Sequence, residues 1–250
     1  METTIYSAPT KTAKTPSITV DEYIEVADKF HWATMRHFKL WFSGKETKRH
    51  RRTETVLARL AKNNRIRTHL YGKKLIYALK RKSQKVDDVG YGKVKHGLAC
   101  TECLVRLYLG NQKGIVYPER AFAGLGVVPE CGIKYVGKEH DTMLLLEYCT
   151  KSNFHYSGLI RGKIAAYQRH IGKIEEKFGV KAFVLFVCDV ERRLVERKVG
   201  SLAAARHDGG STPLLPWYFV DYETFLNVEI GRTLDAEIYI YADEQVYNLK

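Results

Sequence analysis

The stretch that decides the fold is residues 47–80, TKRHRRTETVLARLAKNNRIRTHLYGKKLIYALK. Its first half carries apolar residues at helical spacing, namely Val56, Leu57 and Leu60. We expect a helix there, from about residue 47 to residue 62. In the second half, apolar and polar residues alternate on both sides of YGKK, residues 71–74, which is typical of two strands joined by a hairpin turn.

Two shorter helical patterns precede this stretch, over residues 20–29 and 34–42, and Ser43-Gly44 ends the second. Three helices followed by a basic hairpin is the order of a winged helix. In such a domain the third helix lies in the major groove of DNA, and the hairpin lies near the backbone or minor groove. We therefore expect residues 19–82 to form a winged-helix domain that binds double-stranded DNA.

The positive charge of the chain is concentrated in the same region. The chain has 41 Lys and Arg against 28 Asp and Glu. Sixteen of the basic residues lie between Arg36 and Lys82, with only two acids, Glu46 and Glu54. The rest, with 25 basic and 26 acidic residues, is close to neutral. Solubility alone does not require such a concentration, so the asymmetry favours a polyanionic partner.

The candidate DNA contacts are polar residues of the third helix and the hairpin. They are Lys48, Arg49, Arg51, Arg52, Thr55, Arg59, Arg65, Arg67, Lys73 and Lys74. The alternative is a winged helix used for protein contacts, which the lack of acids and the arginine-rich third helix make less favourable. Contacts to phosphates give affinity without sequence specificity, and the pattern does not say which arginine reads a base.

The remainder of the chain predicts an α/β domain. Residues 1–18 are polar, without the apolar run of an export signal, and are expected to be a flexible tail. Residues 83–93 are expected to be a linker. In residues 94–250, strand patterns alternate with helical ones, which favours a central mixed sheet with helices on its faces. The expected strands are 114–117, 127–136, 142–148, 182–189, 217–222 and a C-terminal edge strand; the expected helices begin near 96 and span 159–178 and 190–199.

Several motifs follow the basic region in a set order. They are HGLACTECLV (96–105), VVPECGI (127–133), LLLEYCTKSNF (144–154), KIAAY (163–167), FVLFVCD (183–189) and WYFVDYETF (217–225). In this order the chain resembles the replication-relaxation family of plasmids and mobile elements. That family is similar to the PD-(D/E)XK nuclease-like fold, placed behind a winged helix.

The resemblance implies a metal-dependent nuclease site, in which carboxylates hold Mg²⁺ or Mn²⁺ near a lysine. The matching acids are Glu102, Glu130 and Glu147, with Glu130 and Glu147 as the metal ligands. The motif places its lysine two residues after Glu147, where this chain has Cys149. Lys151, on the same strand face by alternation, and Lys163, on the next helix, are the two substitutes. Three glutamates that only cap elements or face solvent are an equally weighted alternative.

Zinc binding is not favoured by the cysteine pattern. His96, Cys100 and Cys103 share a helical face, but a structural zinc site usually draws a second ligand pair from another turn. Cys131, Cys149 and Cys188 lie in apolar runs and are expected in the core. Five cysteines without an export signal indicate reduced thiols in a cytoplasm, with the protein on the nucleoid when it is bound to DNA.

The function that we predict is DNA binding in the replication, transfer or transposition of a mobile element. The partners are double-stranded DNA, a second copy of the chain, and replication or transfer proteins of the element, with no membrane. A Mg²⁺-dependent endonuclease and a winged-helix transcriptional repressor are the alternatives. Cys149 leaves open whether the second domain cleaves DNA or is an inactive scaffold.

Overall fold

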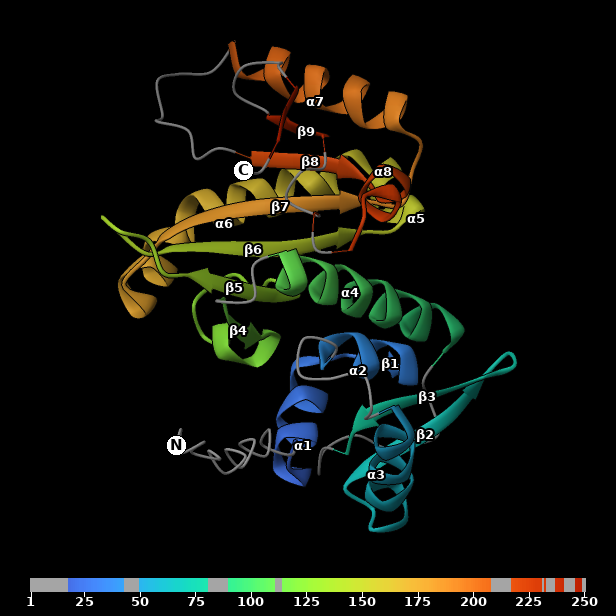
Figure 1. The fold of residues 1–250 in the computed structure, drawn as a ribbon. Helices are drawn as coiled ribbons and strands as arrows, with labels where there is room; N and C mark the ends of the chain where they lie inside the picture. Colours follow the sequence, from blue (N-terminus) through green and yellow to red (C-terminus); the bar gives the residue numbers. More distant parts are fainter. Residues whose placement is uncertain are drawn as a thin grey trace, which may run out of the picture.

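The structure is a computed structural model that describes residues 18–42, 50–80, 90–110, 114–207, 217–230, 232, 237–240 and 246–248. The expected flexible tail, apart from Ile18, lies outside the described residues. Figure 1 shows residues 18–80, here called the N-terminal unit, on one side of a long helix, α4 (Tyr91–Gly110), and a larger sheet on its other side. The protein is α/β with a mixed sheet, as the sequence predicts.

The N-terminal unit begins with a helix that is fixed by its cap. The side chain of Thr19 accepts a hydrogen bond from Glu22 N (3.2 Å), and Thr19 N donates to Glu22 Oε2 (2.6 Å). This helix is α1 (Val20–Lys29). It is followed by β1 (Ala33–Thr34), α2 (Met35–Trp41) and α3 (His50–Lys62). The expected stripe of α3 is buried in the core of the unit.

A β-hairpin of β2 (Ile66–Tyr71) and β3 (Lys74–Leu79) follows α3. The register pairs Tyr71 with Lys74, so Gly72 and Lys73 alone form the turn. Gly72 has a φ of +58°, which a residue without Cβ adopts most readily. The two-residue strand β1 adds to β3 and gives the sheet order β1-β3-β2. The sequence analysis did not predict β1.

The larger sheet has the strand order β10-β9-β8-β7-β6-β5-β4. Its strands are β4 (Ile115–Pro118), β5 (Cys131–Tyr135), β6 (Thr142–Cys149), β7 (Lys181–Cys188), β8 (Trp217–Asp221), β9 (Glu237–Ile240) and β10 (Val246–Asn248). The central strands β6, β7 and β8 are parallel, and the outer pairs are antiparallel. The remaining helices are η3 (Glu119–Phe122), a 3₁₀ turn, with α5 (Lys151–His155), α6 (Ser157–Phe178), α7 (Arg192–His207) and α8 (Tyr222–Asn227).

Alternation along β6 divides the core between the two faces of this sheet. Leu144, Leu146 and Tyr148 pack in one cluster with α4, whereas Met143 and Leu145 pack in another with α6 and α7. The first cluster continues into the N-terminal unit, so the core is shared. At the contact, the rings of Trp41 and Tyr108 stack 3.8 Å apart.

Three expected boundaries are corrected by the structure. Helix α4 begins at Tyr91, so residues 91–93 of the expected linker are helical; residues 83–89 lie outside the described part of the chain. The strand expected over residues 127–136 is confined to β5, because Gly126 adopts a φ of +88° and the next four residues are not in a strand. The helix expected over residues 190–199 begins at Arg192 and extends to His207. Within the described residues, none of the helices has both the length and the apolar character needed to cross a bilayer.

Candidate functional site

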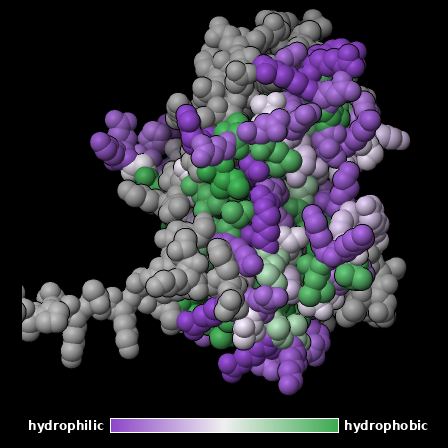
Figure 2. Space-filling view, turned by 45° about the vertical axis from the view of Figure 1, so that its right-hand side comes forward, coloured by the Kyte–Doolittle hydropathy of each residue, from purple (hydrophilic) through white to green (hydrophobic). Residues whose placement is uncertain are grey.

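The exposed face of α3 and the hairpin carry basic side chains. Arg52, Arg59 and Arg65 are exposed, as are Lys73 and Lys74 at the hairpin. Thr55 is also exposed on α3. In Figure 2, hydrophilic side chains lie at the lower end of the molecule, where α3 lies in Figure 1, beside some apolar ones. The charge concentrated in this part of the sequence is therefore partly displayed on one surface.

Not every candidate DNA contact lies on this surface. The side chain of Arg67 is half-buried, and its guanidinium lies over the ring of Trp32, 4.7 Å from the ring centroid. This cation–π contact packs β2 against the segment after α1. Lys48 and Arg49 lie outside the described residues, and Arg51 belongs to the first turn of α3.

Glu102 lies in an ion-pair network and not with the other two glutamates. Its Oε2 accepts hydrogen bonds from Arg36 (2.6 Å) and His37 (2.9 Å), and its Oε1 accepts one from Arg106 (2.8 Å). The Nδ1 of His37 accepts from Thr34 N (3.0 Å), so the proton of the ring is on the nitrogen that faces Glu102. Burial acts to raise the pKa of Glu102, but these three donors outweigh it and lower the pKa to about 2. Glu102 therefore holds α2 against α4.

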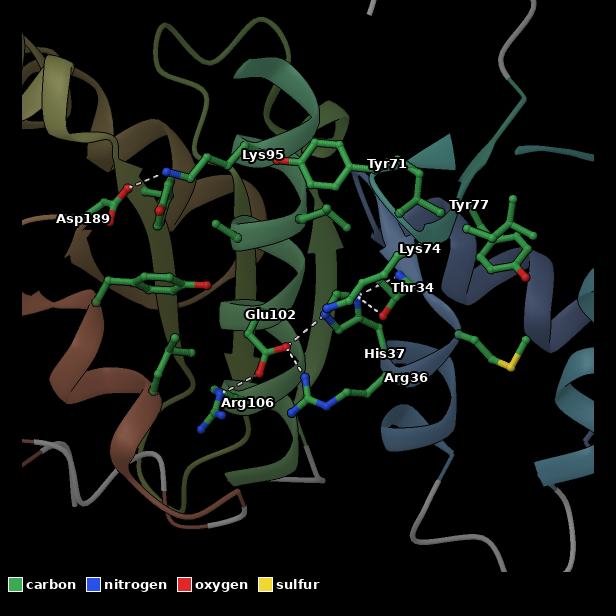
Figure 3. A pocket seen from close by; sticks show the side chains of 18 residues that line it. Thr34, Arg36, His37, Tyr71, Lys74, Tyr77, Lys95, Glu102, Arg106 and Asp189 are labelled. Carbon is green, nitrogen blue, oxygen red and sulfur yellow. Dashed lines mark hydrogen bonds and ion pairs between the residues drawn. The ribbon is translucent and has the colours of Figure 1, made fainter. Parts of the chain in front are cut away.

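A cavity of about 760 Å³ lies beside this network, between the hairpin, α4 and α8. Figure 3 shows basic side chains around it from both parts of the protein: Arg36 and Lys74 from the N-terminal unit, and Lys95 and Arg106 from α4. Lys95 pairs with Asp189 across 3.5 Å. Arg36 and Arg106 pair with Glu102, which also lines the cavity together with Asp189, so acids and cations alternate around it.

Glu130 lies immediately before β5 and contacts two histidines. His96 Nε2 is 2.9 Å from Glu130 Oε1, and His31 Nε2 is 3.5 Å from Glu130 Oε2. The hydrogen bond to Glu130 raises the pKa of His96. Burial acts to raise the pKa of Glu130, but the hydrogen bond and charge of His96 outweigh it and lower the pKa. Glu130 is thus held as a carboxylate.

Glu147 projects from β6 toward α6 and is buried, with 1% of its side chain exposed. It forms an ion pair with Lys163, and Tyr167 donates a hydrogen bond of 2.7 Å to its Oε1. Burial raises the pKa of Glu147. Burial acts to lower the pKa of Lys163, but the carboxylate of Glu147 outweighs it and raises that pKa. The lysine therefore stays protonated against a buried acid.

These two acids lie close together at one end of the sheet. Glu130 N donates to Leu146 O (3.0 Å), and because Leu146 precedes Glu147 in β6, this bond holds Glu130 near Glu147. The charge of Glu130 contributes to the raised pKa of Glu147, and Lys163 contributes to the lowered pKa of Glu130. We call Glu130, Glu147, Lys163, Tyr167 and His96 the carboxylate cluster.

Of the two expected lysines, only Lys163 reaches the cluster. Lys151 was expected on the face of β6 by alternation, and this is wrong because β6 ends at Cys149. Thr150 caps the next helix by accepting from Asn153 N (3.3 Å), so Lys151 becomes the first residue of α5 and is exposed. Cys149, at the position of the motif's lysine, is buried in the core.

The acids of the cluster fit a hard divalent ion only in part. Mg²⁺ usually takes one or two carboxylates and completes its shell with water and substrate phosphate, and Glu130 and Glu147 supply two. Glu102, the third expected acid, belongs to the network with Arg36 and does not contribute. A different donor set lies beside Glu130, where His31 and Cys100 offer ligand atoms within 4.8 Å of one another and of the carboxylate.

The roles of His31 and His96 escaped the sequence analysis. His31 falls within the basic region, where a histidine is expected to contact phosphate or solvent, yet it faces Glu130 of the second part of the chain. The only sequence signal for His96 was its spacing of four residues from Cys100 on one helix.

No protein-family model matches the chain. No curated protein is significantly similar to it in sequence.

Proposed function

We propose that the N-terminal unit is a winged helix that binds duplex DNA. Helix α3 would enter the major groove, and the β2–β3 hairpin would contact the adjacent backbone or minor groove. The observation that carries the proposal is the row of exposed cations on α3 and the hairpin, within the part of the chain that holds its whole positive excess. The motif order of the chain supports a role in the replication, transfer or transposition of a mobile element.

The arrangement of the cations supports this proposal over one of general solubility. Arg52 and Arg59 lie seven residues apart on α3, so they share a face over about two helical turns. Lys73 and Lys74 extend the charge at the end of the hairpin. Such a group of exposed cations attracts the phosphate backbone and binds it in a salt-dependent way.

The test is fluorescence anisotropy with a labelled DNA duplex, measured across a range of salt concentrations. Replacing Arg52 and Arg59 by Ala removes two cations, so we expect affinity to fall at least tenfold and the salt slope to decrease by about two. Lys138→Ala with Lys173→Ala is the matched control, because these exposed lysines lie on the larger domain, away from α3. Equal losses in both double variants, or no salt dependence in the wild type, would contradict the proposal.

A second candidate function is metal-dependent cleavage of the bound DNA, in a PD-(D/E)XK-like site. The observation that favours it is the ion pair of Lys163 with Glu147, since the lysine that the motif lacks at Cys149 is supplied from α6. A divalent ion held by Glu130 and Glu147 would polarise the phosphate and lower the pKa of a bound water. Lys163 would hold its proton near the phosphate and neutralise developing charge.

This candidate is tested with supercoiled plasmid in the presence of Mg²⁺ or Mn²⁺. We expect cleavage that Lys163→Met and Glu147→Gln both reduce by at least 100-fold. Lys151→Met is the matched control, since this lysine is exposed and outside the carboxylate cluster. Absence of cleavage by the wild type with either ion, while DNA binding is intact, would assign the second domain to a non-catalytic role.

A further inference from the structure

Three segments that are distant in sequence bring a histidine, a cysteine and a glutamate together. His31 lies in the turn after α1, Cys100 on α4, and Glu130 before β5. One ligand atom from each of the three lies within 4.8 Å of the others. Among the described residues, this is the group of three or more His, Cys, Asp or Glu side chains whose ligand atoms lie close enough together to hold one metal ion.

The donor set has the chemistry of a zinc site. Imidazole nitrogen, thiolate sulfur and carboxylate oxygen are all zinc ligands, with bonds of about 2.0–2.3 Å, so ligand atoms around a tetrahedral ion lie about 3.3–3.8 Å apart. His31 Nε2 and Glu130 Oε2 are already 3.5 Å apart. Small rotations of the side chains would bring the other pairs into range. A thiolate ligand also distinguishes this site from one for Mg²⁺, which prefers oxygen.

The neighbours of the three residues suit a bound cation. Cys100 is 2% exposed, and a metal ion that binds its sulfur displaces the thiol proton. His96 Nε2, 2.9 Å from Glu130 Oε1, holds the carboxylate in place in the way that outer partners orient metal ligands. His31 and Glu130 are only partly buried, which leaves a path for an ion to enter.

We propose that His31, Cys100 and Glu130 bind one Zn²⁺ ion, with His96 as the positioning residue for Glu130 and a water in the fourth position. The site joins the turn after α1 to α4 and β5, so the ion would fasten the N-terminal unit to the larger domain. It requires neither DNA binding nor cleavage, and its test does not depend on either.

The test measures metal in the purified full-length chain. We expect about one equivalent of zinc by elemental analysis, and replacement by Co²⁺ should give a sulfur-to-cobalt charge-transfer band in the near ultraviolet. His31→Ala, Cys100→Ser and Glu130→Gln should each lose the bound zinc, and Cys100→Ser should also lose the charge-transfer band of the cobalt form. His96→Ala should weaken zinc affinity by about 10- to 100-fold without abolishing it. Cys103→Ser is the matched control, since Cys103 lies one turn further on α4, is equally buried and is outside the three-residue group.

Circular dichroism shows whether each variant folds, and His31→Ala, at a partly exposed position, keeps the test valid if Cys100→Ser does not fold. Zinc bound equally by wild type, His31→Ala and Cys103→Ser would place the ion elsewhere and overturn the proposal. So would failure of the wild type to bind zinc at micromolar free concentration.

Discussion

At the scale of single residues, Glu102 shows how one side chain can join two parts of a chain. The sequence analysis named it as a catalytic acid, because its place on the first helix of the second domain matches the motif. In the structure its carboxylate accepts hydrogen bonds from Arg36, His37 and Arg106, and it has a pKa of about 2. An acid held ionised by three donors stabilises the fold and is poorly suited to accept a proton near neutral pH.

This network predicts a specific dependence of stability on pH. The pKa of Glu102 is lower in the folded state than its ordinary value of 4.5, so its stabilisation is complete above about pH 4.5 and is lost as the pH falls through 2. A shift of the pKa from 4.5 to about 2 corresponds to a contribution of about 3 kcal/mol. Urea unfolding between pH 6 and pH 2 should show that Glu102→Gln lowers the free energy of unfolding at pH 6 by about this amount. The variant and the wild type should converge at the lowest pH.

The exposed Glu139→Gln provides the control, with no change expected at either pH. If Glu102→Gln leaves the stability at pH 6 unaltered, the network does not hold α2 to α4.

The two lysines expected near Glu147, Lys151 and Lys163, show which features of the site can be predicted from the sequence. Alternation correctly places Glu147 and Cys149 on one face of β6, since that rule needs only a continuous strand. It fails at Lys151, because β6 ends at Cys149 and Thr150 caps the helix that begins at Lys151. Lys163 was named as a substitute, but its pairing with Glu147 depends on how α6 packs across β6, which spacing along the chain does not encode.

At the scale of elements, the glycine of the hairpin turn and a glycine of helix α6 differ in backbone conformation, so replacing them should have opposite effects on stability. Gly72 has a positive φ, and a Cβ there would meet no atom within 4 Å, so a substitution would cost only backbone strain. Gly162 lies inside α6 with equally open surroundings and no positive φ, so Ala there would only restrict the unfolded chain. Substitutions at both positions therefore change the free energy of unfolding through the backbone and not through side-chain packing.

We predict that Gly72→Ala lowers the free energy of unfolding by about 1–2 kcal/mol, whereas Gly162→Ala raises it by about 0.5–1 kcal/mol. Gly72→Asn should cost less than Gly72→Ala, because Asn tolerates the left-handed region. Urea unfolding at neutral pH measures all three. A neutral Gly72→Ala would show that the turn adopts another conformation.

Element prediction from the sequence succeeded where a long periodic pattern exists. Helix α3, the hairpin and the strands β6 to β8 follow such patterns and lie where they were expected, within a few residues. Strand β1 was not predicted, because two residues are too few to show an alternation of apolar and polar side chains, although β1 pairs with β3. Val127 and Val128 lengthen the apolar pattern before β5, but the chain there follows the close approach of Gly126 to His170, and the ladder begins only at Cys131.

At the scale of the whole molecule, the expected division into two domains with a linker is changed by the shared core. Helix α4 contributes to a hydrophobic cluster that includes both α1–α3 and one face of the larger sheet. The Glu102 network and the stack of Trp41 on Tyr108 cross the same contact. The composition of a segment shows how polar it is. It does not show that α2 packs on α4, because the two surfaces come together only on folding.

The shared core predicts that the chain unfolds as one cooperative unit. Its three tryptophans allow a direct test, because Trp32 and Trp41 lie in the N-terminal unit and Trp217 lies in β8. In Trp217→Phe, fluorescence follows the N-terminal unit, and in Trp32→Phe with Trp41→Phe it follows the sheet. Within each variant, the urea midpoint by fluorescence should coincide with the midpoint by far-ultraviolet circular dichroism.

Tyr108→Ala removes the stacked partner of Trp41 from the contact between the two parts. In the Trp217→Phe background it should lower the fluorescence midpoint, and it should separate that midpoint from the one seen by circular dichroism, because the N-terminal unit loses part of its hold on α4. Two separate midpoints without this substitution would mean that the N-terminal unit folds independently. The contact with α4 would then contribute little to stability, and the basic surface would act as a module of its own.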